Sequence, residues 1–439
     1  MGKDSKNNNV QDTVTFDDGM EIVFARVAGL DIGKRELTAC VRVPGKNGKF
    51  RDEVRTFSTM TGELLALADW LSAQGVQVVA MEATGAYWKP VYYLLEAVFD
   101  TRLVNPRDVA QVKGRKTDVK DAQWIARLVQ HDLVRSCFVP PEPIRGVREL
   151  TRQRAHLSRD RTRAVARLEK VLEETGLKIS SVASNTLGAS TRAMLQAIVA
   201  GERDPDVLAD LALGRLRAKM PALREALRLA RFTPATAFTI GQLLDQIDLL
   251  DRQIAGYSSQ LESAIAPFEW ARQLLTTAPG ISHDIAMTVI GAIGTDMSQF
   301  PTAAHLASWA GVCPGNNRSA GRSMSAATTH GDSYLRGALG MAAGAIAKTN
   351  SKPCYLKSRY QRLRTRRGPL RAQVAIQHDL LIAIWHMLTN NVEYRELGAD
   401  YYQRKPRTIT HRANRARQLL TELEADGYDT TQLLTTQAA

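Results

Sequence analysis

The sequence predicts an α/β domain followed by a longer, mainly helical part. From about residue 25 to residue 143, short apolar runs alternate with Gly and Pro turn signals, a pattern typical of strands and short helices. After the Pro-rich break at Pro140, Pro141 and Pro143, apolar residues recur at the spacing of amphipathic helices. The length of 439 residues indicates about two or three domains rather than one core.

Three short strands are expected at the start of the α/β domain, at Val27 to Ile32, Leu37 to Val43 and Val54 to Ser58. Gly33 and the segment Pro44 to Gly48 supply turn signals between them, which favours hairpin connections.

Helices and strands alternate in the rest of this domain. The expected elements are a helix at Gly62 to Ser72, a strand at Val76 to Met81, a helix at Tyr87 to Val98, a strand at Arg102 to Asn105 and a helix at Asp118 to Val129. Three hairpin-connected strands followed by this alternation predict a mixed sheet with helices on its faces. This is the order of the ribonuclease H fold.

Two long apolar stripes dominate the next part, one from Val147 to Leu172 and one from Leu243 to Leu261. We expect the two helices to pair as an antiparallel coiled-coil arm. Ser180 to Phe232, between them, indicates short helices and loops without an assignable topology. Trp270 to Tyr394 indicates a further helical region, with a Gly-rich loop from Gly311 to Gly331.

The chain is therefore expected to divide into five parts. These are a flexible arm (1–24), the α/β domain (25–143), the helical arm (144–268), a mainly helical domain that contains the Gly-rich loop (269–395) and a basic tail (396–439).

Composition and charge point to a polyanionic partner. The chain has 58 Lys and Arg against 45 Asp and Glu, a net charge of +13. Hydrophobic residues make up 44% and charged residues 23%, as in globular rather than disordered chains. Because no apolar run reaches membrane-spanning length and the N-terminus lacks a secretory signal, we expect a cytoplasmic protein with no membrane partner.

The four cysteines are Cys40, Cys137, Cys313 and Cys354. They are far apart and form no CxxC pair, so the sequence suggests neither a zinc site nor a disulfide framework. We expect reduced thiols.

Four acids stand out by their positions. Asp31 lies in an otherwise apolar strand, Glu82 ends the strand Val76 to Met81, and Asp118 and Asp121 share one face of a helix. In a ribonuclease H arrangement the first and fourth strands are neighbours and the last helix packs against them, so the four carboxylates can converge. Such a cluster needs a cation, and hard oxygen ligands favour Mg2+, with Mn2+ as the alternative. A metal of this kind supports phosphodiester cleavage.

Two other readings of these acids exist. Asp118 also suits a helix N-terminus as a cap, next to Thr117. A strand acid followed by glycine, like Asp31 and Gly33, also occurs in sugar kinases and actin-like ATPases. Those proteins need a second glycine-rich phosphate loop and an adenosine pocket, and the sequence shows neither.

Two arginine runs indicate nucleic-acid-binding surfaces. They are Arg145, Arg148, Arg152, Arg154, Arg159, Arg161, Arg163 and Arg167 on the first long helix, and Lys357, Arg359, Arg362, Arg364, Arg366, Arg367 and Arg371 later in the chain. Both runs contain few acids and consist mainly of Arg, which favours phosphate backbones, although a solvated face is the ordinary alternative. Tyr355 and Tyr360 accompany the second run and could stack on bases. Separately, Pro279-Gly280-Ile281 is similar to the turn of helix-hairpin-helix modules, which makes Gly280 a candidate phosphate contact.

A candidate nucleophile, Ser319, lies in the Gly-rich loop between Arg318 and Arg322. Small residues there let a phosphate approach closely, and the arginines can neutralise it. A serine in such a loop is also a common turn residue, and Ser323 and Ser325 are competitors for the role.

Activation of Ser319 needs a partner group. His330 and Asp332 are merely near in sequence and form no Ser-His-Asp pattern with it. A metal held by the α/β domain is the more economical activator.

These residues together give the chain a clear resemblance to the DEDD insertion-sequence transposases, bridge-RNA-guided recombinases with a RuvC-like N-terminal domain. The matching segments are Gly29 to Lys34, Met81 to Gly85, Lys116 to Ala122, Pro279 to Ile281, Ala307 to Gly315, Arg318 to Arg322 and Gly331 to Arg336. The resemblance covers about residues 25 to 395. The polar arm, the basic tail and the segment 180–232 depart from the family pattern.

The resemblance implies that Asp31, Glu82, Asp118 and Asp121 are the metal ligands and that Ser319 is the nucleophile. It further implies Mg2+ dependence, a covalent phosphoserine link to DNA, and a homo-oligomer, a dimer or a tetramer, in which the serine of one subunit meets the carboxylates of another. A structured RNA encoded beside the gene would pair with donor and target DNA.

The expected function is therefore that of a transposase that cuts and rejoins the DNA of an insertion sequence. One alternative is a junction-resolving nuclease that uses a metal-activated water and leaves Ser319 structural. Another is a non-catalytic nucleic-acid-binding protein on a ribonuclease H scaffold. A covalent protein–DNA adduct separates the first from the other two, and metal-dependent cleavage separates the second from the third.

Overall fold

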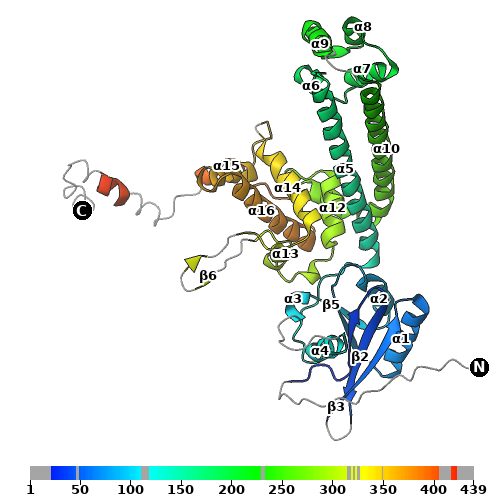
Figure 1. Cartoon of the computed structure of the whole chain (residues 1–439). Helices are drawn as coiled ribbons and strands as arrows, with labels where there is room; N and C mark the ends of the chain where they lie inside the picture. The colour runs from blue at the N-terminus through cyan, green and yellow to red at the C-terminus, as the bar shows by residue number, and fades with distance from the viewer. Residues whose placement is uncertain are drawn as a thin grey trace, which may run out of the picture. The chain divides into compact units, whose positions relative to one another are not determined.

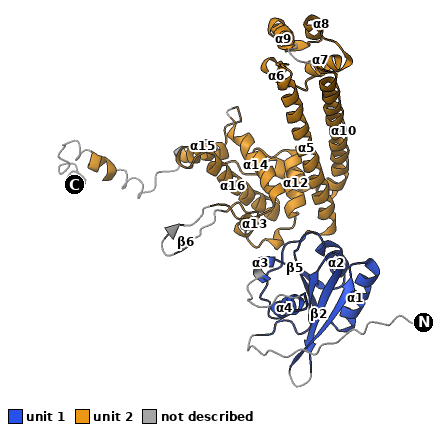
Figure 2. Cartoon of the chain, viewed as in Figure 1, with its two compact units in different colours: residues 1–139 blue, residues 140–439 orange. Residues whose placement is uncertain are grey.

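The computed structural model describes residues 21–45, 49–109, 118–228, 233–313, 318–319, 322–323, 327–348, 350–404 and 417–422. The chain divides into two compact units, residues 1–139 and residues 140–439 (Figure 2). Most of the expected flexible arm and most of the expected basic tail lie outside the described residues.

A mixed five-stranded sheet forms the centre of the first unit. Its strands are β1 (Val27–Ile32), β2 (Glu36–Pro44), β3 (Phe50–Ser58), β4 (Val78–Glu82) and β5 (Asp100–Val104), in the order β3-β2-β1-β4-β5. β1, β2 and β3 are antiparallel neighbours, whereas β4 runs parallel to both β1 and β5. This topology confirms the ribonuclease H-like α/β domain that the sequence predicts.

In the described part of this unit, the helices that accompany the sheet are α1 (Thr61–Ala73), α2 (Trp88–Leu95), α3 (Pro106–Val109) and α4 (Asp118–Gln130). α2 ends three residues earlier than expected, because the chain turns at Leu95 so that Phe99 enters the core while Val98 faces solvent. The single turn of α3 was not predicted from the sequence.

Both faces of the sheet are buried, as the alternation along β1 shows. Ala28 and Leu30 join the core that contains Leu67 of α1, whereas Val27 joins the core that contains Ile125 of α4. Since both faces are largely covered, a charged side chain within the sheet needs a partner, as Arg42 and Asp52 have in each other.

Gly29 is the point at which α4 approaches β1. A Cβ atom on Gly29 would lie 2.3 Å from the carbonyl oxygen of Ala122 and 2.4 Å from the nitrogen of Ala126. Only glycine permits this contact between backbones.

In the second unit, the two long helices α5 (Glu142–Glu174) and α10 (Pro234–Ile265) lie side by side and run in opposite directions (Figure 1). Leu168 and Leu172 of α5 share a core with Leu244 and Ile247 of α10, so the predicted helices and their antiparallel pairing are confirmed.

Short helices cap the far end of this pair, in the segment whose topology the sequence left open. They are α6 (Ile179–Val182), α7 (Ala189–Ala200), α8 (Pro205–Asp210), the 3-10 helix η2 (Gly214–Lys219) and α9 (Met220–Ala226). Their apolar residues, among them Met194, Leu208 and Leu223, extend the core between α5 and α10.

The rest of the second unit is mainly helical, and most of its helices pack together in a bundle around α12, α14 and α16. The elements are η3 (Ala266–Phe268), α11 (Glu269–Thr276), α12 (His283–Ile293), η4 (Met297–Gln299), α13 (Ala303–Trp309), β6 (Arg318–Ser319), β7 (Arg322–Ser323), α14 (Ser333–Ala347), α15 (Tyr355–Arg367), α16 (Pro369–Asn390) and α17 (Tyr401–Arg404). Ile290, Leu339 and Ile384 are fully buried in it. Within the described part of the chain, no helix is both long and apolar enough to cross a membrane.

α5 belongs to this bundle as well as to the helical pair. A Cβ atom on Gly291 of α12 would lie 3.1 Å from the Cα atom of Arg148, so the two helices cross in close contact there. The first half of α5 therefore packs on the bundle, and its second half packs on α10.

Gly29→Ala is expected to destabilise the first unit by about 1–3 kcal/mol, because the new methyl group forces α4 away from β1. Hydrogen exchange of the β1 and α4 amides in the full chain measures this loss. Gly62→Ala, at a helical position with no atom within 4 Å of the added Cβ, is the control and should leave exchange unchanged or slightly slower. Equal exchange in Gly29→Ala and in the parent chain would contradict the packing argument.

Candidate active site

Asp31 and Glu82 lie at the same end of two neighbouring parallel strands. β1 and β4 pair in register up to Leu30 and Met81, and Asp31 and Glu82 are the next residues on each strand. Both side chains are partly exposed, whereas the residues before them are buried. The Oγ1 hydroxyl of Thr84 donates a hydrogen bond of 3.0 Å to Oε1 of Glu82.

The direction of α4 brings the other two acids to this end of the sheet. At the C-terminal end of the helix, the carbonyl of Gln130 accepts hydrogen bonds from the amides of Val23 (3.0 Å) and Phe24 (3.1 Å), which precede β1. α4 therefore runs antiparallel to β1, and its first turn, with Asp118 and Asp121, lies where β1 ends.

A buried ion pair also holds the C-terminal end of α4. The Arg42 guanidinium donates to Oδ1 of Asp52 (2.8 Å) and to Oε1 of Gln130 (2.7 Å). Burial raises the pKa of the Asp52 carboxyl, and the neighbouring Arg42 opposes that rise. The pair fixes the helix at the end opposite to the four acids.

Four carboxylates at one end of a sheet make a donor set of hard oxygens, which suits a divalent cation. The side chains themselves are not drawn together. Among the described residues, no group of three or more His, Cys, Asp or Glu side chains is close enough to hold a metal ion. The backbone thus brings Asp31, Glu82, Asp118 and Asp121 to one edge without closing them around a common point.

The predicted nucleophile lies in the second unit, on a short hairpin. β6 and β7 pair antiparallel, with Arg318 opposite Ser323 and Ser319 opposite Arg322. The structure describes the backbone of these four residues but not their side chains, and Ser325 lies outside the described residues. The sequence predicted a loop here, and the hairpin is an additional finding.

Pro279-Gly280-Ile281 lies in the turn between α11 and α12, the place that a hairpin of the helix-hairpin-helix kind would take. Gly280 has a φ of +79°, and a Cβ atom on it would lie 2.6 Å from the carbonyl oxygen of Ala342 in α14. Backbone conformation and packing therefore already require glycine at this position.

The arginines of α5 have partners that the sequence analysis did not foresee. The run contains few acids along the chain, but acids from other helices meet it. Arg152 pairs with Asp332, Arg154 with Asp284 and Arg161 with Asp251, while Arg163 pairs with Asp160 on α5 itself. Arg145 donates to the carbonyl of Pro140 (2.7 Å).

Arg148 connects α5 to α12 through backbone carbonyls. It donates to the carbonyls of Gly291 (2.8 Å) and Ala292 (2.6 Å), at the crossing of α5 and α12. The run is thus in part a set of links between helices, and Arg159, Arg163 and Arg167 are its exposed members.

The second run lies on α15 and the start of α16. Arg359 pairs with Asp379 of α16, whereas Arg362, Arg364, Arg366 and Arg367 are exposed. Among the described residues, none of these four forms an ion pair, and Arg362 lies over the ring of Tyr402 at 4.8 Å. This surface keeps the net positive charge that the sequence predicted.

The expected stacking of bases on Tyr355 and Tyr360 needs correction. Tyr360 is buried, and the Tyr355 ring already packs edge-on against Tyr401 at 4.9 Å and stacks on Tyr402 at 5.7 Å. Burial and a hydrogen bond with Tyr402 raise the pKa of Tyr355 well above its usual range. The chain after α16 returns to cover the Tyr355 ring, an arrangement that local sequence could not reveal.

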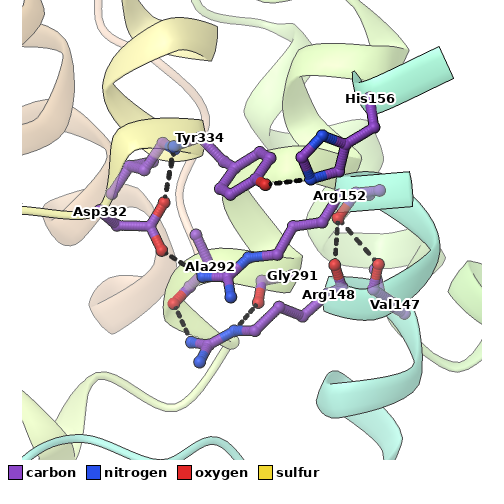
Figure 3. A network of polar contacts seen from close by, with 10 residues as sticks. Val147, Arg148, Arg152, His156, Gly291, Ala292, Asp332 and Tyr334 are labelled. Carbon is purple, nitrogen blue, oxygen red and sulfur yellow. Dashed lines mark hydrogen bonds and ion pairs between the residues drawn. The ribbon is translucent and has the colours of Figure 1, made fainter. Parts of the chain in front are cut away.

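Sequence reasoning also missed a polar network between α5 and the start of α14 (Figure 3). It joins Arg152 and His156 to Asp332 and Tyr334. The spacing of Arg152, His156 and Arg159 on one helix face was a usable signal, but the residues that meet this face are about 180 positions away in the chain.

Known protein families match both units. A family model described as a transposase, of the DEDD group of IS110, matches residues 28–176. A second, described as the transposase IS116/IS110/IS902 family, matches residues 272–361. The chain is also 26% identical over 331 residues to the transposase for insertion sequence element IS1111A of Coxiella burnetii (strain RSA 493 / Nine Mile phase I), covering 73% of this chain and 80% of that protein.

The two matches agree with the structure. The first contains the sheet, α4 and all four acids, and the second contains the turn at Gly280 and the hairpin with Ser319. Transposases are enzymes that cut and rejoin DNA, and a DEDD domain implies the use of a divalent metal. Together the two family models cover more than half of the chain. The chain therefore belongs to the IS110 family of DEDD transposases.

Proposed function

We propose that this transposase cuts and rejoins DNA with Ser319 as nucleophile and with Mg2+ held by Asp31, Glu82, Asp118 and Asp121. The observation that supports the proposal most strongly is that the ends of β1 and β4 and the first turn of α4 meet at one edge of the sheet. That edge carries one Glu and three Asp residues. The DEDD group of transposases is named for the same four residue types.

The carboxylates would hold the metal from two sides, Asp31 and Glu82 from the sheet and Asp118 and Asp121 from the helix. Mg2+ suits this set because all its ligands are hard carboxylate oxygens. When bound, the cation would neutralise charge on the phosphate that reacts. The partly exposed positions of Asp31 and Glu82 leave them accessible to a ligand.

In the proposed reaction the Oγ atom of Ser319 forms a bond to the phosphorus of a phosphodiester. The bond between phosphorus and one DNA oxygen breaks, the serine loses its proton, and the released DNA oxygen gains one. The product is a phosphoserine ester that conserves the energy of the broken bond, so a DNA hydroxyl can reverse the step and rejoin a strand without ATP.

The proposal includes two further partners. A structured RNA encoded beside the gene would pair with donor and target DNA, and a homo-oligomer, a dimer or a tetramer, would bring the serine of one subunit to the carboxylates of another. The support is the resemblance of the motifs, together with the exposed arginines of α15 as a surface for phosphate backbones.

Asp31→Asn and Asp121→Asn are each expected to abolish strand cleavage while nucleic-acid binding persists, because each removes a metal ligand and relieves repulsion among the acids. Cleavage of a plasmid carrying the element's own flanking DNA, with Mg2+ and RNA transcribed from that DNA, measures the effect. Asp69→Asn, at an exposed acid of α1 in the same unit, is the matched control and should cleave normally. Parental cleavage rates in Asp31→Asn would remove Asp31 from the site.

Ser319→Ala is expected to lose both cleavage and the covalent adduct, yet still to bind DNA, RNA and metal. The assay traps products under denaturing conditions and locates the modified peptide by mass. Ser323→Ala and Ser325→Ala serve as controls within the same loop.

Two outcomes would change the assignment of the nucleophile. An adduct on Ser323 or Ser325 would move the nucleophile within the loop. Efficient cleavage by Ser319→Ala without any adduct would instead identify a nuclease that uses water.

Replacing Arg364, Arg366 and Arg367 with Ala is expected to weaken nucleic-acid binding by removing phosphate contacts. Log affinity falls as log salt rises, and each lost contact should make this slope shallower by about 0.9 for duplex DNA or about 0.7 for single strands. Arg228→Ala, at an exposed arginine that pairs with Glu225, is the control. An unchanged slope in the triple variant would make α15 a solvated face.

A further inference from the structure

The loop that carries Ser319 has a tight stem, which consists of residues 310–311 and 329–331. A Cβ atom on Gly331 would lie 2.2 Å from the carbonyl oxygen of Ala310, and one on Gly311 would lie 2.6 Å from that of Thr329. The two ends of the loop are therefore in backbone contact, and the paired strands β6 and β7 lie between them along the chain. A contact that fixes the position of the stem therefore restricts the positions that β6 and β7 can take.

Asp332 follows the stem directly and has two functions. Its Oδ1 atom accepts hydrogen bonds of 2.9 Å from the amides of Tyr334 and Leu335 and so caps α14. Its Oδ2 atom accepts a hydrogen bond of 2.5 Å from Nη2 of Arg152 on α5 (Figure 3). The Asp332 side chain is 9% exposed and that of Arg152 is 34% exposed, so the ion pair is partly shielded from water.

Tyr334 adds a second attachment to the same face of α5. The guanidinium carbons of Arg152 and Arg159 lie 4.9 Å and 5.1 Å from the centre of its ring, within cation–π range. The Tyr334 hydroxyl and Nε2 of His156 share a hydrogen bond of 2.6 Å. Three residues of α5 at helical spacing thus hold the first turn of α14.

This part of α5 is itself fixed to the bundle. Arg148, one turn before Arg152, bonds the carbonyls of Gly291 and Ala292 at the end of α12, as Figure 3 shows. A rigid helix therefore carries Arg152, and the chain of contacts runs from α12 through α5 to Asp332 and the stem.

We infer that Arg152 and Asp332 are a positioning pair that fixes the stem of the Ser319 loop on α5, so that the serine is held where the phosphodiester is attacked. The inference rests on the proposed function of Ser319. It assigns Arg152 a task other than the phosphate contact that its place in the arginine run suggested. Neither residue takes part in bond formation.

The test compares Asp332→Asn, Arg152→Gln and the double variant in the full-length protein, using the plasmid substrate and flanking RNA described above. Asn at position 332 keeps an oxygen that can cap α14 but loses the charge that pairs with Arg152. The measurements are the single-turnover rate of adduct formation, the affinity for DNA and the salt slope of that affinity. Arg152→Lys, which retains the charge, should recover part of the rate.

We expect each single variant to lower the rate by on the order of a hundredfold, with unchanged DNA affinity and salt slope, since misplacement costs rate rather than binding. The double variant should be no slower than the slower single variant, because both changes break one interaction. The control is Asp284→Asn, which breaks the Arg154–Asp284 pair (2.6 Å) between α5 and α12 and does not touch the stem. It should leave the rate unchanged.

Four results would overturn the inference. If Arg152→Gln weakens DNA binding and lowers the salt slope while Asp332→Asn does not slow the reaction, Arg152 is a phosphate contact. If Asp284→Asn slows the reaction as much as Asp332→Asn, the pair contributes only general stability. If the parent protein forms no adduct on Ser319, the proposed function fails together with the inference, whereas a normal parental adduct with unchanged variants removes the inference alone.

Discussion

The contact between α4 and β1 at Gly29 is the constraint on which the first unit depends. Ala122 and Ala126 lie so close to Gly29 that no side chain fits between strand and helix. This contact, with the bonds at Gln130, sets both the distance and the direction of α4. As a result the first turn of the helix, where two acids lie, meets the end of the strand that bears Asp31. The close packing of α4 on Gly29 therefore determines that Asp118 and Asp121 lie at the same edge of the sheet as Asp31.

A similar relation between packing and chemistry holds in the second unit, where α5 takes part in two cores. Its C-terminal half pairs with α10 through leucines, and its N-terminal half packs on α12 where Gly291 lets the backbones approach. Because the helix is fixed in this way, its arginines meet carbonyls and carboxylates of neighbouring helices. Buried or partly buried guanidinium groups need such partners, and each partner in turn orders the segment that carries it. The start of α14, next to the loop of Ser319, is one such segment.

Local pattern predicted much of this architecture. The strands β1 and β2 and the helices α1, α4, α5 and α10 lie close to where apolar periodicity and turn residues suggested, because burial on one face or two imposes a period on the sequence. The positions of the four acids at strand and helix ends followed from the order of elements. Local pattern did not predict three other features, because each depends on contacts between distant segments. These are the short helices at the end of the long helical pair, the turn of α3 and the covering of Tyr355 by Tyr401 and Tyr402.

By itself the sequence determined the α/β domain, the long helices, the positive charge and the motifs that identify the family, because these depend on residue type and on spacing along the chain. Only the tertiary structure decided which arginines remain exposed. Arg148 and Arg152 look the same in sequence as Arg364 and Arg366, yet the first two contact α12 and Asp332, and the other two face solvent. The reason is physical: a charge is neutralised by whatever lies beside it in space, and Asp332 is 180 residues away from Arg152 along the chain.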